Sequence, residues 1–90
     1  MNIEERNELY EKIFKEIEKY RFTGYSDEVV FKEGNVYPGS IDVYSYPAYP
    51  EEELTDEDCY QGTIYIEEDG IHWEGEIIKD INELFNRLGL

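Results

Sequence analysis

The chain has 90 residues, of which 40% are hydrophobic and 16% aromatic, so we expect a single folded domain spanning residues 1–90 rather than a disordered chain. Its 23 acidic and 8 basic residues give a formal net charge of −15. A charge of this size repels nucleic acid and anionic membranes. The composition therefore argues against direct binding to either and favours a basic protein as the partner.

The single cysteine, Cys59, has no second cysteine with which to form an internal disulfide, which is typical of a reducing compartment. The first residues, MNIEERNELYEK, are charged throughout and do not resemble a signal peptide. No apolar run approaches the roughly 20 residues that a membrane span requires. We therefore expect a cytoplasmic protein.

The negative charge is concentrated in the middle of the chain. Residues 23–60 carry ten acids and one base, a net charge of −9, whereas residues 1–22 carry six acids and five bases, a net charge of −1. Residues 61–90 carry seven acids and two bases, a net charge of −5. The densest stretch is Glu51–Asp58, in which six of eight residues are carboxylates.

The first elements follow from hydrophobic spacing. Asn2–Tyr20 has apolar residues at helical intervals and a first residue suited to an N-cap, which predicts an amphipathic helix. Glu28–Glu33 and Ile41–Tyr46 are predicted as strands. A long acidic loop, residues 47–61, follows them, and within it Pro50–Leu54 has the composition of one helical turn.

The next two runs, Thr63–Glu68 and Ile71–Glu76, flank Asp69-Gly70, a pair typical of a two-residue type I′ hairpin turn. This turn sets a register in which Glu67 lies opposite His72. One face of the hairpin then carries Ile64, Ile66, Ile71 and Trp73, and the other carries Tyr65, Glu67, His72, Glu74 and Glu76.

The apolar stripe of residues 80–88 predicts a final helix, capped by Asp80 and ended by Gly89. The order of elements is then α-β-β-β-β-α. Consecutive strands between terminal helices indicate an α+β domain, in which an antiparallel sheet packs against both helices on one face.

The uncovered face of this sheet is the main functional indication. Carboxylates and tyrosines alternate on it, and Glu74 and Glu76 are expected about 6.7 Å apart along one strand. Like charges this close cost stability, and tyrosine is favoured in interfaces, so the pattern indicates a binding surface. The predicted partner-binding residues are Asp42, Tyr44, Tyr46, Tyr49, Glu51, Glu52, Glu53, Asp56, Glu57, Asp58, Tyr65, Glu67, Glu74 and Glu76.

Other kinds of site have weaker support. The acidic stretch lacks the ligand spacing and central glycine of a hand-type calcium loop, and Cys59 and His72 are too few for a structural zinc site. Cys59 and His72 are a conceivable nucleophile and base, but the acids around Cys59 disfavour a thiolate, and no phosphate-binding loop is present. We therefore predict no catalytic residues, no metal and no cofactor. The simplest alternative is that the acidic face only keeps the protein soluble.

The runs EEELTDED and IEEDGIHWEGE, the charge and the predicted order of elements resemble the small acidic proteins by which phages disarm bacterial defence, including anti-CRISPR proteins and other DNA mimics. The resemblance implies a non-catalytic inhibitor. Its acidic side chains would occupy the basic nucleic-acid groove of a CRISPR-type or other defence nuclease and block access of DNA or RNA.

Two further readings remain open from sequence alone. The first is an immunity protein or antitoxin that neutralises a basic toxin nuclease, which requires nearly the same surface. The second is a small acidic structural or interaction domain. An exposed edge strand leaves a homodimer open as well.

Overall fold

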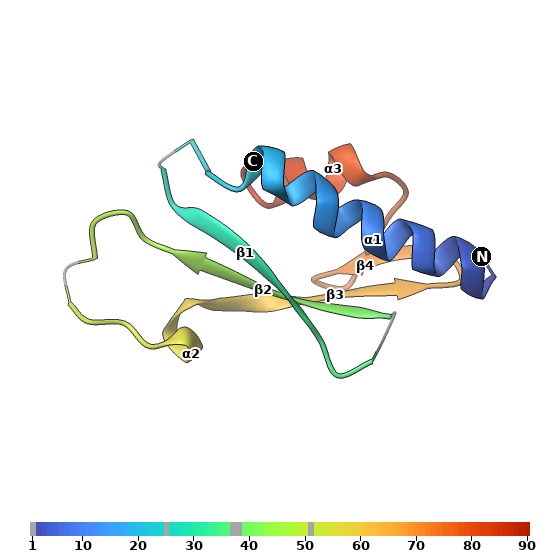
Figure 1. Cartoon of the computed structure of the whole chain (residues 1–90), viewed down its shortest axis with the longest axis horizontal. Helices are drawn as coiled ribbons and strands as arrows, with labels where there is room; N and C mark the ends of the chain where they lie inside the picture. Colours follow the sequence, from blue (N-terminus) through green and yellow to red (C-terminus); the bar gives the residue numbers. More distant parts are fainter. Residues whose placement is uncertain (1, 25, 37–38, 51) are drawn as a thin grey trace.

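The computed structural model describes residues 2–24, 26–36, 39–50 and 52–90, and it shows an antiparallel sheet with two helices on the same side (Figure 1). The five strands lie in chain order across the sheet, β1-β2-β3-β4-β5. The predicted α+β class is confirmed. The elements are α1 (Ile3–Tyr20), β1 (Glu28–Glu33), β2 (Ser40–Tyr46), α2 (Asp56–Cys59), β3 (Tyr60–Glu67), β4 (Gly70–Trp73), β5 (Glu76–Ile78) and α3 (Ile81–Arg87).

Helix α1 forms as its sequence predicts. The side chain of Asn2 accepts a hydrogen bond from the backbone N–H of Glu5 at 2.9 Å, which satisfies one of the free donors at the helix start. Tyr10, Ile13 and Ile17 recur on one face of the helix and are buried against the sheet. None of the helices in the described part of the chain is long and apolar enough to cross a membrane.

The register of the β3–β4 hairpin differs from the predicted one by two residues. Glu67 pairs with Gly70 and Tyr65 with His72, so the turn consists of Glu68 and Asp69. Gly70 is needed in the strand, because a Cβ there would lie 3.1 Å from the carbonyl oxygen of Ile78 in β5. The shift is an even number of residues, so the paired side chains of the two strands, Ile64, Ile66, Ile71 and Trp73 on one side and Tyr65, Glu67 and His72 on the other, keep their predicted faces.

The predicted strand Ile71–Glu76 is interrupted by a tight turn. Glu74 and Gly75 both have positive φ, +51° and +80°, as a type I′ turn requires. The chain therefore reverses at these residues and forms a fifth strand, β5, in which Ile78 pairs with Ile71. The prediction of a single strand through Glu76 is wrong, because the turn at Glu74-Gly75 was not recognised.

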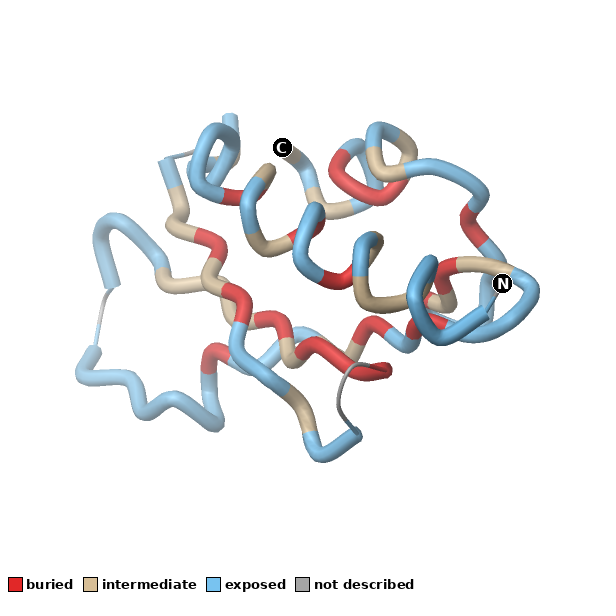
Figure 2. The backbone as a smooth tube through the Cα atoms, turned by 45° about the vertical axis from the view of Figure 1, so that its right-hand side comes forward, coloured by how far each residue is buried: buried red, intermediate tan, exposed pale blue. Residues whose placement is uncertain are grey.

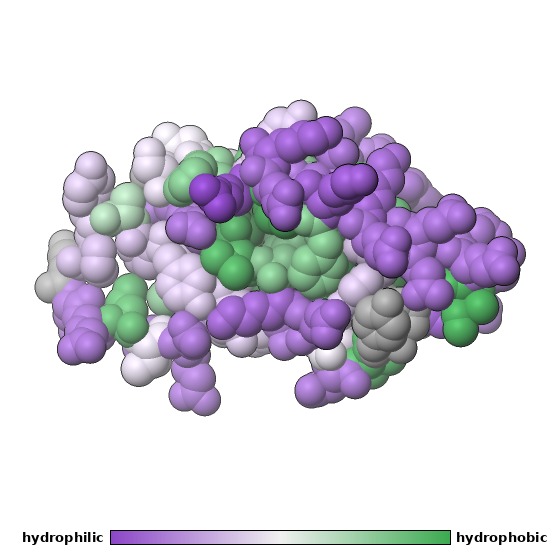
Figure 3. Space-filling view, in the orientation of Figure 1, coloured by the Kyte–Doolittle hydropathy of each residue, from purple (hydrophilic) through white to green (hydrophobic). Residues whose placement is uncertain are grey.

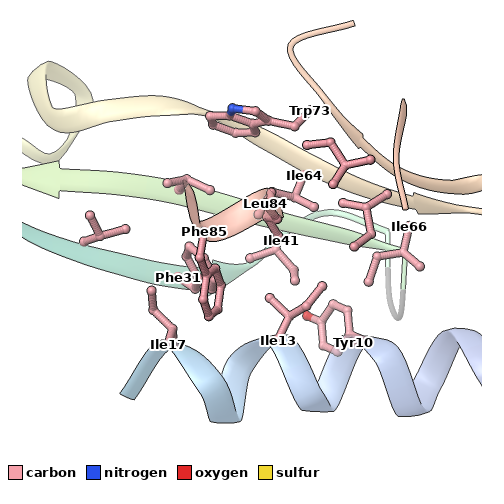
Figure 4. Packing of buried hydrophobic residues seen from close by; sticks show 14 residues of the cluster. Tyr10, Ile13, Ile17, Phe31, Ile41, Ile64, Ile66, Trp73, Leu84 and Phe85 are labelled. Atoms are coloured by element: carbon pink, nitrogen blue, oxygen red, sulfur yellow. The ribbon is translucent and has the colours of Figure 1, made fainter. Parts of the chain in front are cut away.

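The core lies between the sheet and the two helices. In Figure 2 the buried residues line the facing sides of these two layers. Figure 4 shows Tyr10, Ile13 and Ile17 extending from α1 toward Phe31, Ile41 and the β3 isoleucines. Leu84 and Phe85 of α3 complete this layer. The four residues predicted for the inner hairpin face are all buried: Ile64, Ile66, Ile71 and Trp73.

A bulge in β3 brings the Trp73 ring against Gly62. The pairing between β2 and β3 shifts at Val43/Tyr44, because Gly62 pairs with Val43 while Tyr60 pairs with Tyr44. Gly62 has a φ of +153°, and a Cβ at this position would lie 3.1 Å from two ring atoms of Trp73. Glycine is therefore required here by both backbone and packing.

We predict that Gly62→Ala lowers the free energy of unfolding by about 1–3 kcal/mol, because the added methyl displaces the buried indole. Urea unfolding followed by tryptophan fluorescence measures this change. Gly24→Ala is the matched control, since nothing lies within 4 Å of a Cβ at that position. Equal stability of the two variants would contradict the packing argument.

Candidate functional site

We call the side of the sheet that is turned away from α1 and α3 the outer face. Figure 1 shows that neither of these helices covers it, and that the short helix α2 lies at one end of it. The pairing of the strands defines its side chains. They are Glu28, Val30, Lys32, Ser40, Asp42, Tyr44, Tyr46, Tyr60, Thr63, Tyr65, Glu67, His72 and Ile77.

Five of the predicted binding residues lie on this face. The alternation in β2 places Asp42, Tyr44 and Tyr46 outward, while Ile41 and Val43 are buried on the inner side. In β3 the outward ring of Tyr65 is 46% exposed, whereas Ile64 and Ile66 on either side of it are fully buried. The five residues on the outer face are Asp42, Tyr44, Tyr46, Tyr65 and Glu67.

Two predicted members do not belong to the outer face. Glu74 lies in the β4–β5 turn rather than in a strand. Glu76 pairs with the inward-facing Trp73, and its carboxylate forms an ion pair with Arg87 of α3. Glu76 therefore joins β5 to the covering helix. The two carboxylates do not form the expected repeat along one strand, because the turn separates them.

The acidic segment, residues 47–50 and 52–58 of the described chain, forms the short helix α2 at its end rather than a helical turn at Pro50–Leu54. Thr55 caps this helix: its hydroxyl accepts from the backbone N–H of Asp58 at 3.3 Å, and the Asp58 carboxylate accepts from both the Thr55 N–H and hydroxyl at 3.0 Å. This reciprocal arrangement is a capping box. Asp58 therefore holds its own helix and is not a free binding group.

Three acids of the segment have carboxylates that extend into solvent. Glu52, Glu53 and Glu57 are exposed, and no hydrogen bond or ion pair engages their carboxylates within the described residues. Tyr49 is 92% exposed. Glu51, which was also predicted as a binding residue, lies outside the described residues. The exposed course of residues 47–50 and 52–55 is visible at the left of Figure 2.

Asp56 connects α2 to the outer face. Its Oδ1 accepts a hydrogen bond from the Tyr46 hydroxyl at 2.9 Å, and its Oδ2 lies 3.6 Å from the Lys32 ammonium. Desolvation raises the pKa of Tyr46, and the hydrogen bond to Asp56 adds to this rise. Desolvation opposes the charge on Lys32, but the negative charge of Asp56, with a contribution from Tyr46, outweighs it and raises the pKa of Lys32. Both groups keep their protons at neutral pH.

Three tyrosine rings form one cluster over β2 and β3. Tyr44 and Tyr46 stack at a centroid distance of 6.2 Å and an interplanar angle of 11°, and Tyr60 meets Tyr44 edge-on at 5.6 Å. The Lys32 ammonium lies 4.5 Å from the Tyr44 centroid. Ring packing and the cation–π contact orient these side chains, so the cluster is a preformed aromatic surface.

Sequence reasoning missed Tyr60 and Thr63. Simple alternation back from Tyr65 places Tyr60 on the inner face, and only the bulge turns it outward. Its hydroxyl lies 2.5 Å from the Thr63 hydroxyl, which in turn donates to Asp42 Oδ1 at 2.9 Å. Tyr60 therefore donates to Thr63, and a short chain of hydrogen bonds ends on the Asp42 carboxylate. A glycine inside the strand pattern was the available signal for the bulge.

The groups considered for catalysis or metal binding lie apart. His72 lies opposite Tyr65 rather than Glu67, and its Nε2 is 2.6 Å from Asp69 Oδ1. This hydrogen bond lowers the pKa of Asp69. Cys59 is buried. Within the ranges that the structure describes, no three His, Cys, Asp or Glu side chains converge as metal ligands do.

Comparison with protein-family models, with curated proteins and with solved structures finds no match to this chain.

We predict that acidification removes a stabilising contribution of Asp58. Its hydrogen bonds from the Thr55 backbone and side chain hold the pKa of Asp58 below the ordinary value of 3.8. The contribution is fully present above the unfolded pKa and is lost as the pH falls through the lower folded value. Wild type should be more stable than Asp58→Asn near neutral pH, and urea unfolding should show this difference shrinking as the pH falls below the ordinary carboxyl pKa of 3.8.

The neighbouring variant Glu57→Gln is the control, because its carboxylate has no described partner. Its stability relative to wild type should vary far less with pH. A difference for Asp58→Asn that stays constant across the same range would show that the capping carboxylate contributes nothing through its charge.

Proposed function

We propose that this protein is a non-catalytic inhibitor that binds the nucleic-acid groove of a basic protein, a CRISPR-type or other defence nuclease, and competes with DNA or RNA. The supporting observation is the outer face. A sheet face without a helical cover presents carboxylates and tyrosines, and α2 with the acidic segment extends it at one end. Competitive occlusion of the groove is the proposed mechanism.

The electrostatics of this face support the proposal. Lys32 is the one lysine or arginine among the outer-face residues, and Asp56 and the Tyr44 ring already engage it. The remaining charges are negative, apart from the histidine, and the free carboxylates of Glu52, Glu53 and Glu57 add to them. A basic groove meeting this surface exchanges its phosphate contacts for carboxylate contacts.

The tyrosine rings support the proposal as well, because they can take the place of the bases of a nucleic acid while the carboxylates take the place of its phosphates. Proteins that bind single strands combine a positive groove with planar groups that stack on bases. The cluster of Tyr44, Tyr46 and Tyr60 offers planar rings beside carboxylates, in an orientation fixed before binding. A surface that served only for solubility has no need of a preformed aromatic cluster.

The first experiment is a pull-down from host lysate at low and high salt, with partners identified by mass spectrometry. The expected partner is a basic nucleic-acid-binding protein that is retained at low salt and released by added DNA or RNA. A partner that stays bound while nucleic acid is added in excess would contradict competition for the groove.

We predict that the triple variant Glu52→Lys, Glu53→Lys, Glu57→Lys weakens binding to that partner at least about tenfold, because it replaces attraction by repulsion at the acidic segment. Titration of the purified proteins by calorimetry measures this. The fold should persist, because these carboxylates make no described contact. Asp56 and Asp58 are left unchanged, since they hold Tyr46 and the α2 cap.

The matched control is Glu8→Lys, Glu11→Lys, Glu18→Lys, which changes the net charge equally on the exposed side of α1. Circular dichroism verifies the helix in both variants. If both variants lose the same affinity, net charge alone drives the binding and the acidic segment has no special role.

A further inference from the structure

The outer face contains a hollow between its tyrosines. Its volume is about 300 Å³, and it lies over β2 and β3 beside the β1–β2 connection. Asp42 and Thr63 are opposite each other in the two strands, with Tyr65 on one side of them along the sheet and Tyr60 on the other. The lining residues are Asn35, Val36, Ser40, Asp42, Tyr60, Thr63 and Tyr65.

The Asp42 carboxylate has acceptor capacity left in this hollow. Its Oδ1 receives the Thr63 hydroxyl at 2.9 Å, and within the described residues no lysine or arginine forms an ion pair with it. The nearest candidate by pairing, Lys32, is opposite Asp42 across the β1–β2 ladder but makes its ion pair with Asp56. Since no described residue donates to Oδ2, this oxygen can accept from a donor outside the chain.

The same face already shows how it holds a cation. The Lys32 ammonium lies 4.5 Å from the centroid of the Tyr44 ring and 3.6 Å from Asp56 Oδ2, so a ring and a carboxylate bind one positive charge together. The hollow repeats this combination with Asp42 as the carboxylate and the half-exposed rings of Tyr60 and Tyr65 as the aromatic walls.

We propose that this hollow is an anchor site for one arginine side chain of the basic partner, with its guanidinium on Asp42 and its planar faces against Tyr60 and Tyr65. This inference deepens the proposed function and rests on it for the identity of the partner. Arginine fits better than lysine, because its planar fork both pairs with a carboxylate and stacks on aromatic rings.

The anchor differs from the acidic segment in kind. Glu52, Glu53 and Glu57 are exposed and attract any positive charge at long range, with an effect that salt screens. Asp42 is half-buried and already bonded to Thr63, so a guanidinium there loses water and makes short, directed contacts. Contacts of this kind contribute specificity for arginine rather than general attraction.

The test uses the full chain, labelled with ¹⁵N, and the peptide acetyl-Gly-Arg-Gly-amide. Titration followed by NMR should move the amide signals around Asp42, Thr63 and Tyr65 before those of the acidic segment and α1. The lysine peptide should bind more weakly at this position. The citrulline peptide, which lacks the positive charge, should leave the signals unmoved.

Two single-charge variants sharpen the test. Asp42→Asn keeps an acceptor for Thr63 but removes the charge, and it should weaken arginine-peptide binding at the hollow about tenfold. Glu33→Gln removes one exposed charge from β1 outside the outer face, and it should change binding less than about twofold. The removal of one wall by Tyr65→Ala should also erase the preference for arginine over lysine.

Equal binding of the arginine and lysine peptides, or equal losses in Asp42→Asn and Glu33→Gln, would overturn the anchor site. The proposed function is tested separately. If reversal of the acidic segment abolishes partner binding while Asp42→Asn does not, the anchor fails and the inhibitor proposal stands. If the peptide binds at Asp42 but no partner is displaced by nucleic acid, the anchor stands and the proposed function fails.

Discussion

Burial on a single face of the sheet is the constraint on which the rest of this structure depends. Both longer helices lie on the inner side, so the buried hydrophobic side chains converge there from alternate strand positions. Figure 3 shows apolar side chains visible between the helical layer and the sheet, with hydrophilic ones above and below. The opposite face must then be stable in water, and tyrosine suits it because its ring packs while its hydroxyl stays hydrated.

The acids of this chain fall into two groups with different physical roles. Some are held by donors of the fold: Asp58 by Thr55, Asp56 by Tyr46 and Lys32. Others, such as Glu52 and Glu53, have no described partner. The first group orders the acidic segment, and the second adds unpaired negative charge to its surface. A high density of negative charge is thus kept in a defined place without a large number of compensating bases.

Hydrophobic alternation made the faces of the sheet predictable. Ile64 and Trp73 fall on the inner face even though the hairpin register was two residues off, because an even shift preserves the sides. The errors came from local turn chemistry. Glu74-Gly75 continues the strand pattern of the sequence, but both residues have positive φ and form a turn. Thr55 and Asp58 have the spacing of a capping box, which fixes the start of α2. The contact of Lys32 with Asp56 joins segments that are far apart in the sequence, and no local sequence pattern predicts such a contact.

The position of the acidic segment has a consequence for how this protein changes over generations. The chain leaves β2 at Tyr46 and reaches β3, the neighbour of β2 in the sheet, through α2, so the acidic segment connects adjacent strands. Lengthening such a loop costs only about 0.6 kcal/mol for each doubling. Insertions and substitutions there leave the core almost untouched. The charged segment can therefore change in length and sequence while the sheet and its helices stay as they are.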